Sequence, residues 1–313
     1  MSAPECILFA GQADQRPGMG AELWRLPAAR QALERLTPHL GDDLEELTTR
    51  APAHVLARTR NTQRAMHAQH LGYLFALRAR EPELELDGAI GHSVGVVAAL
   101  VAAGALEPED SARFIAARGE AFALACAAGE PHGLAAVTLE EPEDEADLTE
   151  TLAAEPALEL ALHNAPGRCV IGGPRAALDA FAARAQREEW PLRVQVLEVE
   201  GAFHTAAFAG CRERLAPVVA ALEVRAPRCP VFMGTSGQAE RDPARIRELL
   251  LAQPARLERH LDAVRAAHAA GCRRFVEPAT HPGPSRWLGW QLGAGRLPAD
   301  VRLRTLDALA LRA

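Results

Sequence analysis

Positive charge is in short supply in this sequence. The 313 residues include 34 Lys+Arg against 41 Asp+Glu, which gives a formal net charge of -7 at pH 7. All of the basic residues are Arg, since no lysine occurs. A protein that holds a polyanion usually presents a basic field, so this balance disfavours a nucleic-acid partner. The lack of lysine indicates a bias in the coding sequence and carries no information on mechanism.

Long apolar runs are also missing. The apolar residues make up 49% of the chain, in short runs broken by Arg, Glu and Pro. None reaches the roughly 18 residues needed to cross a bilayer, and no basic segment precedes an apolar one at the N-terminus. We therefore expect a cytoplasmic globular protein with no membrane partner. Its length is sufficient for more than one folded unit.

The six cysteines form no CxxC pair and have no histidine partner at metal-ligand spacing. They are dispersed along the chain as Cys6, Cys126, Cys169, Cys211, Cys229 and Cys272. This distribution predicts buried free thiols and no metal site.

Two short apolar segments have the form of buried strands. Cys6–Phe9 ends in a turn-rich loop, and Leu86–Ile90 runs into a glycine-rich turn and then a small, apolar helix. The stretch 22–77 between them is mostly helical in pattern, with interruptions predicted near Pro38 and Pro52.

A different pattern occupies the middle of the chain. Strands are predicted at 134–138, 158–163, 169–172 and 192–199, with helices after Glu140 and over 174–187. This βαββαβ order is typical of a ferredoxin-like domain. Because helices and short strands resume afterwards, we expect a small domain, 129–199, inserted into a large α/β-hydrolase-like domain with a short parallel sheet, 1–128 and 200–313. The site should lie in the cleft between them.

Gly91-His92-Ser93-Val94-Gly95 is a GxSxG sequence between a predicted strand and a predicted helix. This is the context of a nucleophile elbow. Two glycines allow the sharp turn, and a helix N-terminus leaves amide N–H groups free for an oxyanion. The sequence therefore predicts Ser93 as a nucleophile, although the pentapeptide alone also fits a chance glycine-rich turn.

A serine hydroxyl needs a base to act as a nucleophile at neutral pH. We predict that His204 supplies it, because this residue directly follows the last strand of the insert, where the chain returns to the cleft. His92 adjoins Ser93 and should point elsewhere, as a structural hydrogen-bond partner.

Further motifs occur in order from Phe9 to about Leu288. They are GQADQ at 11–15, NTQ at 61–63, GHSVG at 91–95, RGE at 118–120, NAPG at 164–167, AFHT at 202–205, and FVE at 275–277 with HP at 281–282. In this order they resemble motifs of the malonyl-CoA:acyl-carrier-protein transacylases, including the acyltransferase domains of polyketide synthases. The resemblance covers nearly the whole chain.

The resemblance implies roles for the matching residues. Ser93 matches the acylated nucleophile and His204 the general base. Gln12 and Val94 match the positions whose backbone N–H groups form the oxyanion hole.

Three more positions match residues that bind substrate or orient the base. Arg118 matches the arginine that binds the free carboxylate of the acyl group, a task suited to a guanidinium because it binds carboxylates in a bidentate manner. Phe203 precedes the histidine, as in malonyl-selective members. Gln253 matches the glutamine whose backbone carbonyl orients the histidine.

The activity implied is transfer of a malonyl or related acyl group from CoA, through an acyl-serine, to the phosphopantetheine thiol of an acyl carrier protein. Acyl-CoA and the carrier protein are then substrates and partners, and no bound cofactor is required. The context implied is polyketide, fatty acid or other specialised biosynthesis.

Several positions depart from the family's motifs. Val96-Val97 stand where the family usually has Glu-Tyr, Asp14 replaces a serine, and Arg64 replaces a proline. The segment 257–260 reads LERH where the family often has PVxW. No matched catalytic group is lost, so the departures bear on the acyl group and the carrier surface more than on the chemistry.

Three alternatives remain open at this point. The first is a same-fold acyltransferase that moves a different acyl group between carrier proteins. The second is a serine hydrolase such as an editing thioesterase, disfavoured by the lack of an HGGG-like loop and by the retained Arg118. The third is a non-catalytic docking subunit.

Overall fold

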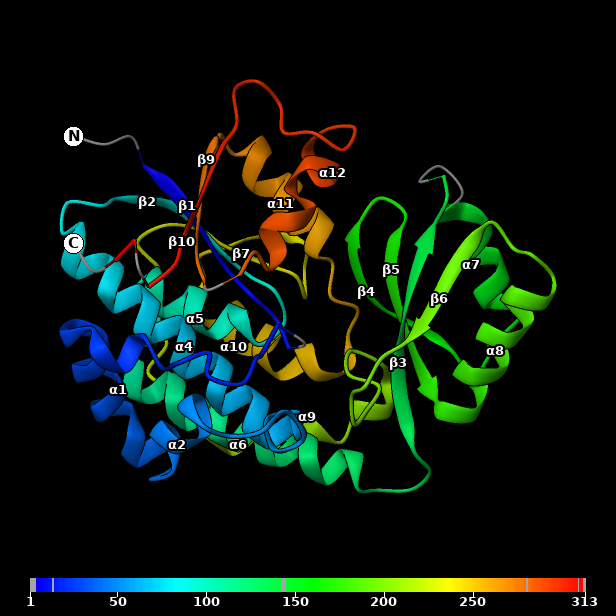
Figure 1. The fold of residues 1–313 in the computed structure, drawn as a ribbon, viewed down its shortest axis with the longest axis horizontal. Helices are drawn as coiled ribbons and strands as arrows, with labels where there is room; N and C mark the ends of the chain where they lie inside the picture. The colour runs from blue at the N-terminus through cyan, green and yellow to red at the C-terminus, as the bar shows by residue number, and fades with distance from the viewer. Residues whose placement is uncertain (1–3, 13, 142–144, 280, 309, 312–313) are drawn as a thin grey trace.

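The computed structural model describes residues 4–12, 14–141, 145–279, 281–308 and 310–311. It contains two β-sheets, one of six strands and one of four, and helices that pack on both (Figure 1). The mixed α/β fold predicted from the sequence is confirmed. None of the helices in the described residues combines the length and apolar character that a bilayer crossing needs.

The larger sheet has the strand order β10-β9-β1-β2-β7-β8. Its strands are β1 (Glu5–Phe9), β2 (Leu86–Gly91), β7 (Val231–Met233), β8 (Gln238–Glu240), β9 (Arg274–Pro278) and β10 (Arg302–Leu306). All neighbours are parallel except β7 and β8. Parallel strands end at the same edge, so the carboxyl ends of β1 and β2 lie side by side there, and the loops that follow them carry the site.

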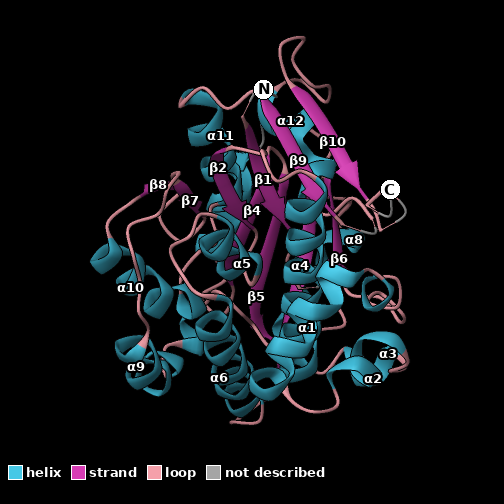
Figure 2. Cartoon of the chain, turned by 90° about the vertical axis from the view of Figure 1, so that its left-hand side faces the viewer, coloured by secondary structure: helices cyan, strands magenta, loops and turns pink. Residues whose placement is uncertain are grey.

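Helices cover both faces of this sheet (Figures 1 and 2). They are α1 (Pro27–Leu40), α2 (Leu44–Thr49), α3 (Ala53–Leu56), α4 (Thr59–Arg80), α5 (Gly95–Ala102), α6 (Pro108–Cys126), α9 (Cys211–Ala221), α10 (Pro243–Ala252), α11 (His260–Ala269) and α12 (Leu288–Leu292). Alternation along β1 explains the two layers, because successive side chains of a strand point to opposite faces. Ile7 and Phe9 belong to the core that contains α4 and α5, whereas Cys6 and Leu8 pack with α11.

The smaller sheet has the order β4-β5-β3-β6 and is antiparallel throughout. Its elements are β3 (His132–Leu139), α7 (Glu145–Ala153), β4 (Glu159–Ala165), β5 (Arg168–Pro174), α8 (Arg175–Arg187) and β6 (Leu192–Val196). This is the βαββαβ order expected from the sequence, with both helices on one face (Figure 1). The two-domain division at 129–199 stays a proposal that fits this separation of the sheets.

The predicted interruption of the helical pattern near Pro38 is present, and several strand ends differ from the prediction by one to three residues. The helix α1 runs through Pro38 and ends at Leu40, followed by Gly41 at φ 114°. The proline lies in the last turn, and the positive φ of the glycine ends the helix. The strand β6 ends at Val196, three residues before the predicted end, and the chain then turns toward the site.

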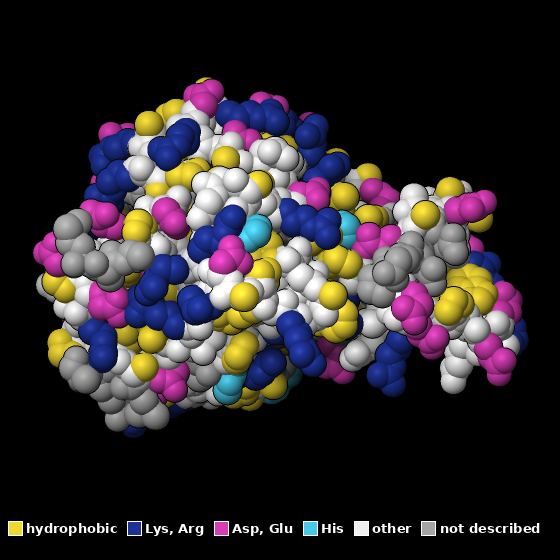
Figure 3. Space-filling view, turned by 90° about the horizontal axis from the view of Figure 1, so that it is seen from above, with side chains coloured by type: hydrophobic (Ala, Val, Ile, Leu, Met, Phe, Trp, Pro, Cys, Tyr) yellow, Lys and Arg dark blue, Asp and Glu magenta, His cyan; other side chains and the backbone are white. Residues whose placement is uncertain are grey.

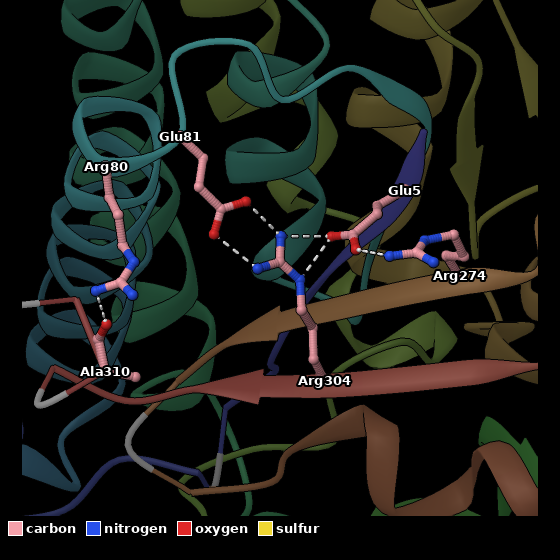
Figure 4. A network of polar contacts seen from close by, with 6 residues as sticks. All are labelled: Glu5, Arg80, Glu81, Arg274, Arg304 and Ala310. Carbon is pink, nitrogen blue, oxygen red and sulfur yellow. Dashed lines mark hydrogen bonds and ion pairs between the residues drawn. The ribbon is translucent and has the colours of Figure 1, made fainter. Parts of the chain in front are cut away.

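The edge strand β10 is fastened by a polar network (Figure 4). The Arg304 guanidinium donates to Glu5 Oε2 at 2.8 Å and to both oxygens of Glu81 at 2.7 and 2.8 Å. Arg274 forms a further ion pair with Glu5 at 3.4 Å. The Glu5 carboxylate, on a residue only 3% exposed, therefore has cationic partners from two neighbouring strands, which compensates the cost of burying it.

Candidate active site

The turn between β2 and α5 holds Ser93 in a strained backbone conformation. Its φ is 51°, in the left-handed region that non-glycine residues rarely adopt. The flanking glycines are required by close packing: a Cβ on Gly91 would lie 2.1 Å from the carbonyl carbon of Gly95, and one on Gly95 would lie 2.6 Å from the Ala10 oxygen. The glycines therefore permit the strand and helix to approach closely while Ser93 projects from the turn between them.

The predicted pair Ser93 and His204 is brought together, 111 residues apart in sequence. The distance between Ser93 Oγ and His204 Nε2 is 2.7 Å. His204 Nδ1 lies 3.0 Å from the Gln253 carbonyl oxygen and 3.2 Å from that of Arg256. Since carbonyls only accept, Nδ1 carries the proton, and Nε2 is free to accept from the serine hydroxyl.

The backbone also fixes His204. Its N–H donates to the Pro254 oxygen at 2.8 Å, and its φ is 66°. Burial, and next the nearby charge of Arg118, lower the pKa of the imidazole to about 3. The ring is therefore neutral at physiological pH, the form that can accept a proton.

A pocket of about 200 Å³ opens onto Ser93 and His204. Its residues come from the loops of the larger sheet and from the strands of the smaller one. The apolar ones are Leu134, Ala136, Leu162, Val170, Leu197, Val199, Phe203 and Trp287, and the polar ones, besides the pair, are Gln12, Asp14, His92, Asn164 and Arg286. The pocket therefore lies where the two sheets meet, as the sequence predicted.

Of the two predicted oxyanion positions, Gln12 lines the pocket and Val94 follows Ser93, which lines it. Gln12 lies in the loop after β1, and Val94 directly precedes the first residue of α5. Among the described residues, neither backbone N–H donates to another group. The first N–H groups of a helix have no partner within the helix, so Val94 can donate to a developing negative charge.

His92 takes the structural place predicted for it. Its Nε2 lies 2.7 Å from Oδ1 of Asn164, a residue near the end of β4. Its ring packs edge-on against His260 at 4.9 Å between centroids. A Cβ on Gly11 would lie 2.1 Å from His92 Nδ1, so the glycine lets the first loop pass close to this ring.

Arg118 lies on α6, 1% exposed, and is not one of the described residues that line the pocket surface. It donates to Gln63 Oε1 at 2.6 Å and to Gln253 Oε1 at 3.2 Å, and its guanidinium lies 4.2 Å from the ring centre of Phe122. Burial lowers the pKa of Arg118 to about 10, so it remains a cation at neutral pH. Phe203 stacks on Phe122 at 5.3 Å and joins this group to the pocket wall.

A residue without a predicted role completes the group. Glu258 is fully buried, and its Oε1 accepts the Ser93 N–H at 3.2 Å. The sequence signal was the departure LERH at 257–260, which places a carboxylate at the second position of the PVxW pattern. Burial raises the pKa of Glu258 to about 7, against the lowering effects of the Ser93 N–H and of Arg118.

The thiols are free, and five of the six are buried. The structure does bring Cys169 near a histidine, which spacing alone did not suggest. Glu145, His163 and Cys169 offer ligand atoms within 4.8 Å of one another. Glu145 Oε1 already accepts from the Gly167 N–H at 2.6 Å and lies 3.1 Å from His163 Nε2, so these contacts serve to fix the turn after β4.

Known proteins share both the sequence and the fold. The family model "Acyl transferase domain" matches residues 7–286. The chain is 32% identical over 276 residues to the malonyl CoA-acyl carrier protein transacylase of Bacillus subtilis, covering 87% of this chain and 85% of that protein. It is 33% identical to the polyketide biosynthesis protein ThaF of Burkholderia thailandensis, over 88% of this chain but only 23% of ThaF.

A solved structure agrees along the whole length. The crystal structure of MCAT from Mycobacterium tuberculosis superimposes with a TM-score of 0.88 at 26% identity, covering 99% of this chain and 98% of that one. Because the family match spans most of the sequence and includes both Ser93 and His204, the chain belongs to the acyl transferase domain family.

Proposed function

We propose that this chain transfers a malonyl group from CoA, through an ester of Ser93, to the phosphopantetheine thiol of an acyl carrier protein. The observation that carries the proposal is the 2.7 Å contact of Ser93 Oγ with His204 Nε2, with Arg118 buried behind it. The names of the B. subtilis relative and of other similar proteins describe this transfer. The reaction needs the side chains of this site and two substrates, the thioester of acyl-CoA and the thiol of the carrier protein, with no cofactor.

The first half-reaction loads the enzyme. Ser93 Oγ attacks the thioester carbonyl while His204 Nε2 takes the hydroxyl proton. The Gln12 and Val94 N–H groups donate to the oxyanion of the tetrahedral intermediate. When the intermediate collapses, the C–S bond breaks, His204 protonates the departing CoA sulfur, and the acyl group stays as an ester on Ser93.

The second half-reaction reverses these roles. The pantetheine thiol of the carrier protein gives its proton to His204, and its sulfur attacks the ester carbonyl. The C–O bond to Ser93 breaks, and His204 returns the proton to the serine oxygen. The result is an acyl thioester on the carrier and free enzyme, with no net consumption of protons.

Polar atoms near Arg118 support binding of a carboxylate. Arg118 Nε and Gln63 Nε2 are both buried donors that have no hydrogen-bond partner among the described residues. An unpartnered buried donor is costly, and the carboxylate of a malonyl group could satisfy it. An acetyl group could not, since it has no charged end, so this arrangement favours malonyl.

The carrier protein must approach the mouth of the pocket. Arg286 lies there, paired with Asp14 at 2.8 Å and stacked on Trp287 at 4.3 Å. Figure 3 shows arginine and acidic side chains interspersed over the face seen from above. Because the overall charge is negative, we propose that a local group of arginines, rather than the global field, recognises an acidic carrier.

Arg118→Ala tests the proposed substrate. We expect kcat/KM for malonyl-CoA to fall by about 100-fold, because losing a buried charged hydrogen-bond donor costs about 3 kcal/mol, while acetyl-CoA changes far less. Arg118→Lys should give an intermediate loss for malonyl, since ammonium lacks the bidentate geometry. Both substrates would be measured by intact mass of the acyl-enzyme in rapid-quench samples. Equal losses for the two acyl groups would overturn the role of Arg118 as the carboxylate-binding residue.

A further inference from the structure

The carboxylate of Glu258 contacts the backbone of Ser93 and occupies a space that neighbouring residues leave open. Glu258 is positioned by backbone pairing with β4: its N–H donates to the Ala161 oxygen, and its own oxygen accepts the His163 N–H, both at 2.9 Å. A Cβ on Gly234 would lie 2.0 Å from Glu258 Oε1, so only glycine at 234 leaves room for this side chain. Neighbouring segments on both sides thus accommodate a buried acid.

Gln253 links this acid to Arg118. Its Oε1 accepts from Arg118 at 3.2 Å, and its Nε2 donates to the Ser93 carbonyl at 3.0 Å. The same amide lies close enough to Glu258 to lower its pKa. Glu258 Oε2 has no hydrogen-bond partner among the described residues. A buried carboxyl group and a buried cation therefore lie on either side of one glutamine, next to the backbone of Ser93.

We propose that Glu258 is a specificity-determining residue, whose carboxylate acts as the countercharge of Arg118 in the free enzyme and opposes acyl groups that carry a carboxylate of their own. This inference rests on the proposed function, in which Arg118 binds the malonyl carboxylate. It predicts that the protein is less selective for malonyl over acetyl than it would be with Arg118 present and the Glu258 carboxylate absent.

Either of two carboxylates, that of Glu258 or that of the acyl group, can neutralise the charge of Arg118. With Glu258 ionised, the buried pair with Arg118 is neutral, and an incoming carboxylate adds an uncompensated negative charge in a region of low dielectric. With Glu258 protonated, the same carboxylate becomes the only anion beside Arg118. An acetyl group is uncharged and is indifferent to this change.

Other titratable groups around Glu258 do not reproduce this effect. His204 is neutral above about pH 5, because burial lowers its pKa to about 3, and it serves both acyl groups alike. His92 and His260 are also buried with lowered pKa values and remain neutral. His163, on β4, directs its ring toward Glu145. Arg118 stays charged, and burial raises the pKa of Cys211, the thiol near it, to about 11.

The test compares kcat/KM for malonyl-CoA and acetyl-CoA across pH, by acyl-enzyme mass. In the unaltered protein the malonyl/acetyl ratio should fall by about tenfold as Glu258 ionises between about pH 6 and 8. Glu258→Gln, which keeps the shape and an acceptor for the Ser93 N–H, should hold the ratio high and flat with pH. Glu277→Gln is the matched control: it removes another buried carboxyl with a raised pKa, near 7, whose partners are Gly283 and Ser285. That variant should keep the pH-dependent ratio.

A malonyl/acetyl ratio that did not change with pH in the unaltered protein would overturn the inference. This measurement needs no variant, so it remains available if the Glu258→Gln protein fails to fold. Equal effects of Glu258→Gln on both acyl groups would show a purely structural residue. If Arg118→Ala left the malonyl/acetyl ratio unchanged, the proposed function itself would fail. If Arg118→Ala lowered the ratio but Glu258→Gln did not raise it, the proposed function would stand and only the role of Glu258 would fail.

Discussion

Ser93→Ala is expected to abolish formation of an acyl-enzyme. The alanine has no oxygen to form the ester, and no other hydroxyl is seen within hydrogen-bond distance of His204 Nε2 among the described residues. Loss of the nucleophile removes the covalent route altogether, so activity should fall by at least about 10⁴-fold, toward the level left by binding and the oxyanion hole. Intact mass after incubation with malonyl-CoA would show no adduct.

A matched control separates this effect from a general loss of serine. Ser236 lies in the turn after β7, and within the described part of the chain its hydroxyl hydrogen-bonds only to local backbone groups, the Met233 oxygen and the Gln238 N–H. Ser236→Ala should acylate at the unaltered rate. An adduct that persisted in Ser93→Ala would place the nucleophile elsewhere and remove the basis of the proposed reaction.

His204→Ala should slow acylation by about 10²- to 10⁴-fold, the usual contribution of a positioned general base. His92→Ala provides the informative comparison. His92 adjoins Ser93 in the chain, but its Nε2 is bound to Asn164, so its loss should cost much less. Rapid-quench measurement of the acylation rate would rank the two. A larger loss from His92→Ala would reverse the assignment of the base.

The pH dependence follows from the burial of His204. The base must be neutral to accept the serine proton, and its pKa is lowered to about 3. For acetyl-CoA, kcat/KM should therefore show no decline due to this group as pH falls from about 7 to 5. An exposed histidine would lose half of its neutral form near pH 6.5. A decline centred there, absent in His204→Ala, would show that the ring is less buried in solution.

Local chemistry made much of this site predictable. A GxSxG between a strand and a helix needs its glycines for steric reasons, and Gly91 and Gly95 have backbone atoms within 3 Å of where a Cβ would stand. His204 was predicted because it follows the last insert strand, and the structure places it 2.7 Å from Ser93 Oγ. The catalytic roles assigned to the two residues remain proposals that this geometry supports.

Long-range contacts were not predictable from local pattern. Glu258 was recognised as a departure from a family motif, yet nothing near it in sequence shows that Gly234 makes room for its carboxylate or that Ser93 lies above it. The edge strand β10 was also missed. Its alternation of Arg and Leu at 302–304 fits a half-exposed strand, but its partners Glu5 and Glu81 lie more than 200 residues away.

The remaining alternatives predict different fates for the acyl group. A hydrolase would release CoA continuously without a carrier protein, whereas a transferase holds the ester until a thiol arrives. The wall of the pocket beside Ser93 is largely apolar and includes Leu162 and Phe203, and we expect it to limit the entry of water. A docking subunit would leave Ser93 unreactive toward acyl-CoA and toward a fluorophosphonate probe.

The most direct measurement follows one malonyl group through a single turnover. The enzyme is mixed with malonyl-CoA, quenched and digested, and the adduct is mapped by mass; a second sample is chased with phosphopantetheinylated carrier protein before quenching. We predict an adduct on the peptide containing Ser93 that disappears as the carrier gains the same mass. Malonylation of the carrier with no intermediate on Ser93, or an adduct that decays to free malonate at the same rate with and without carrier, would contradict the account.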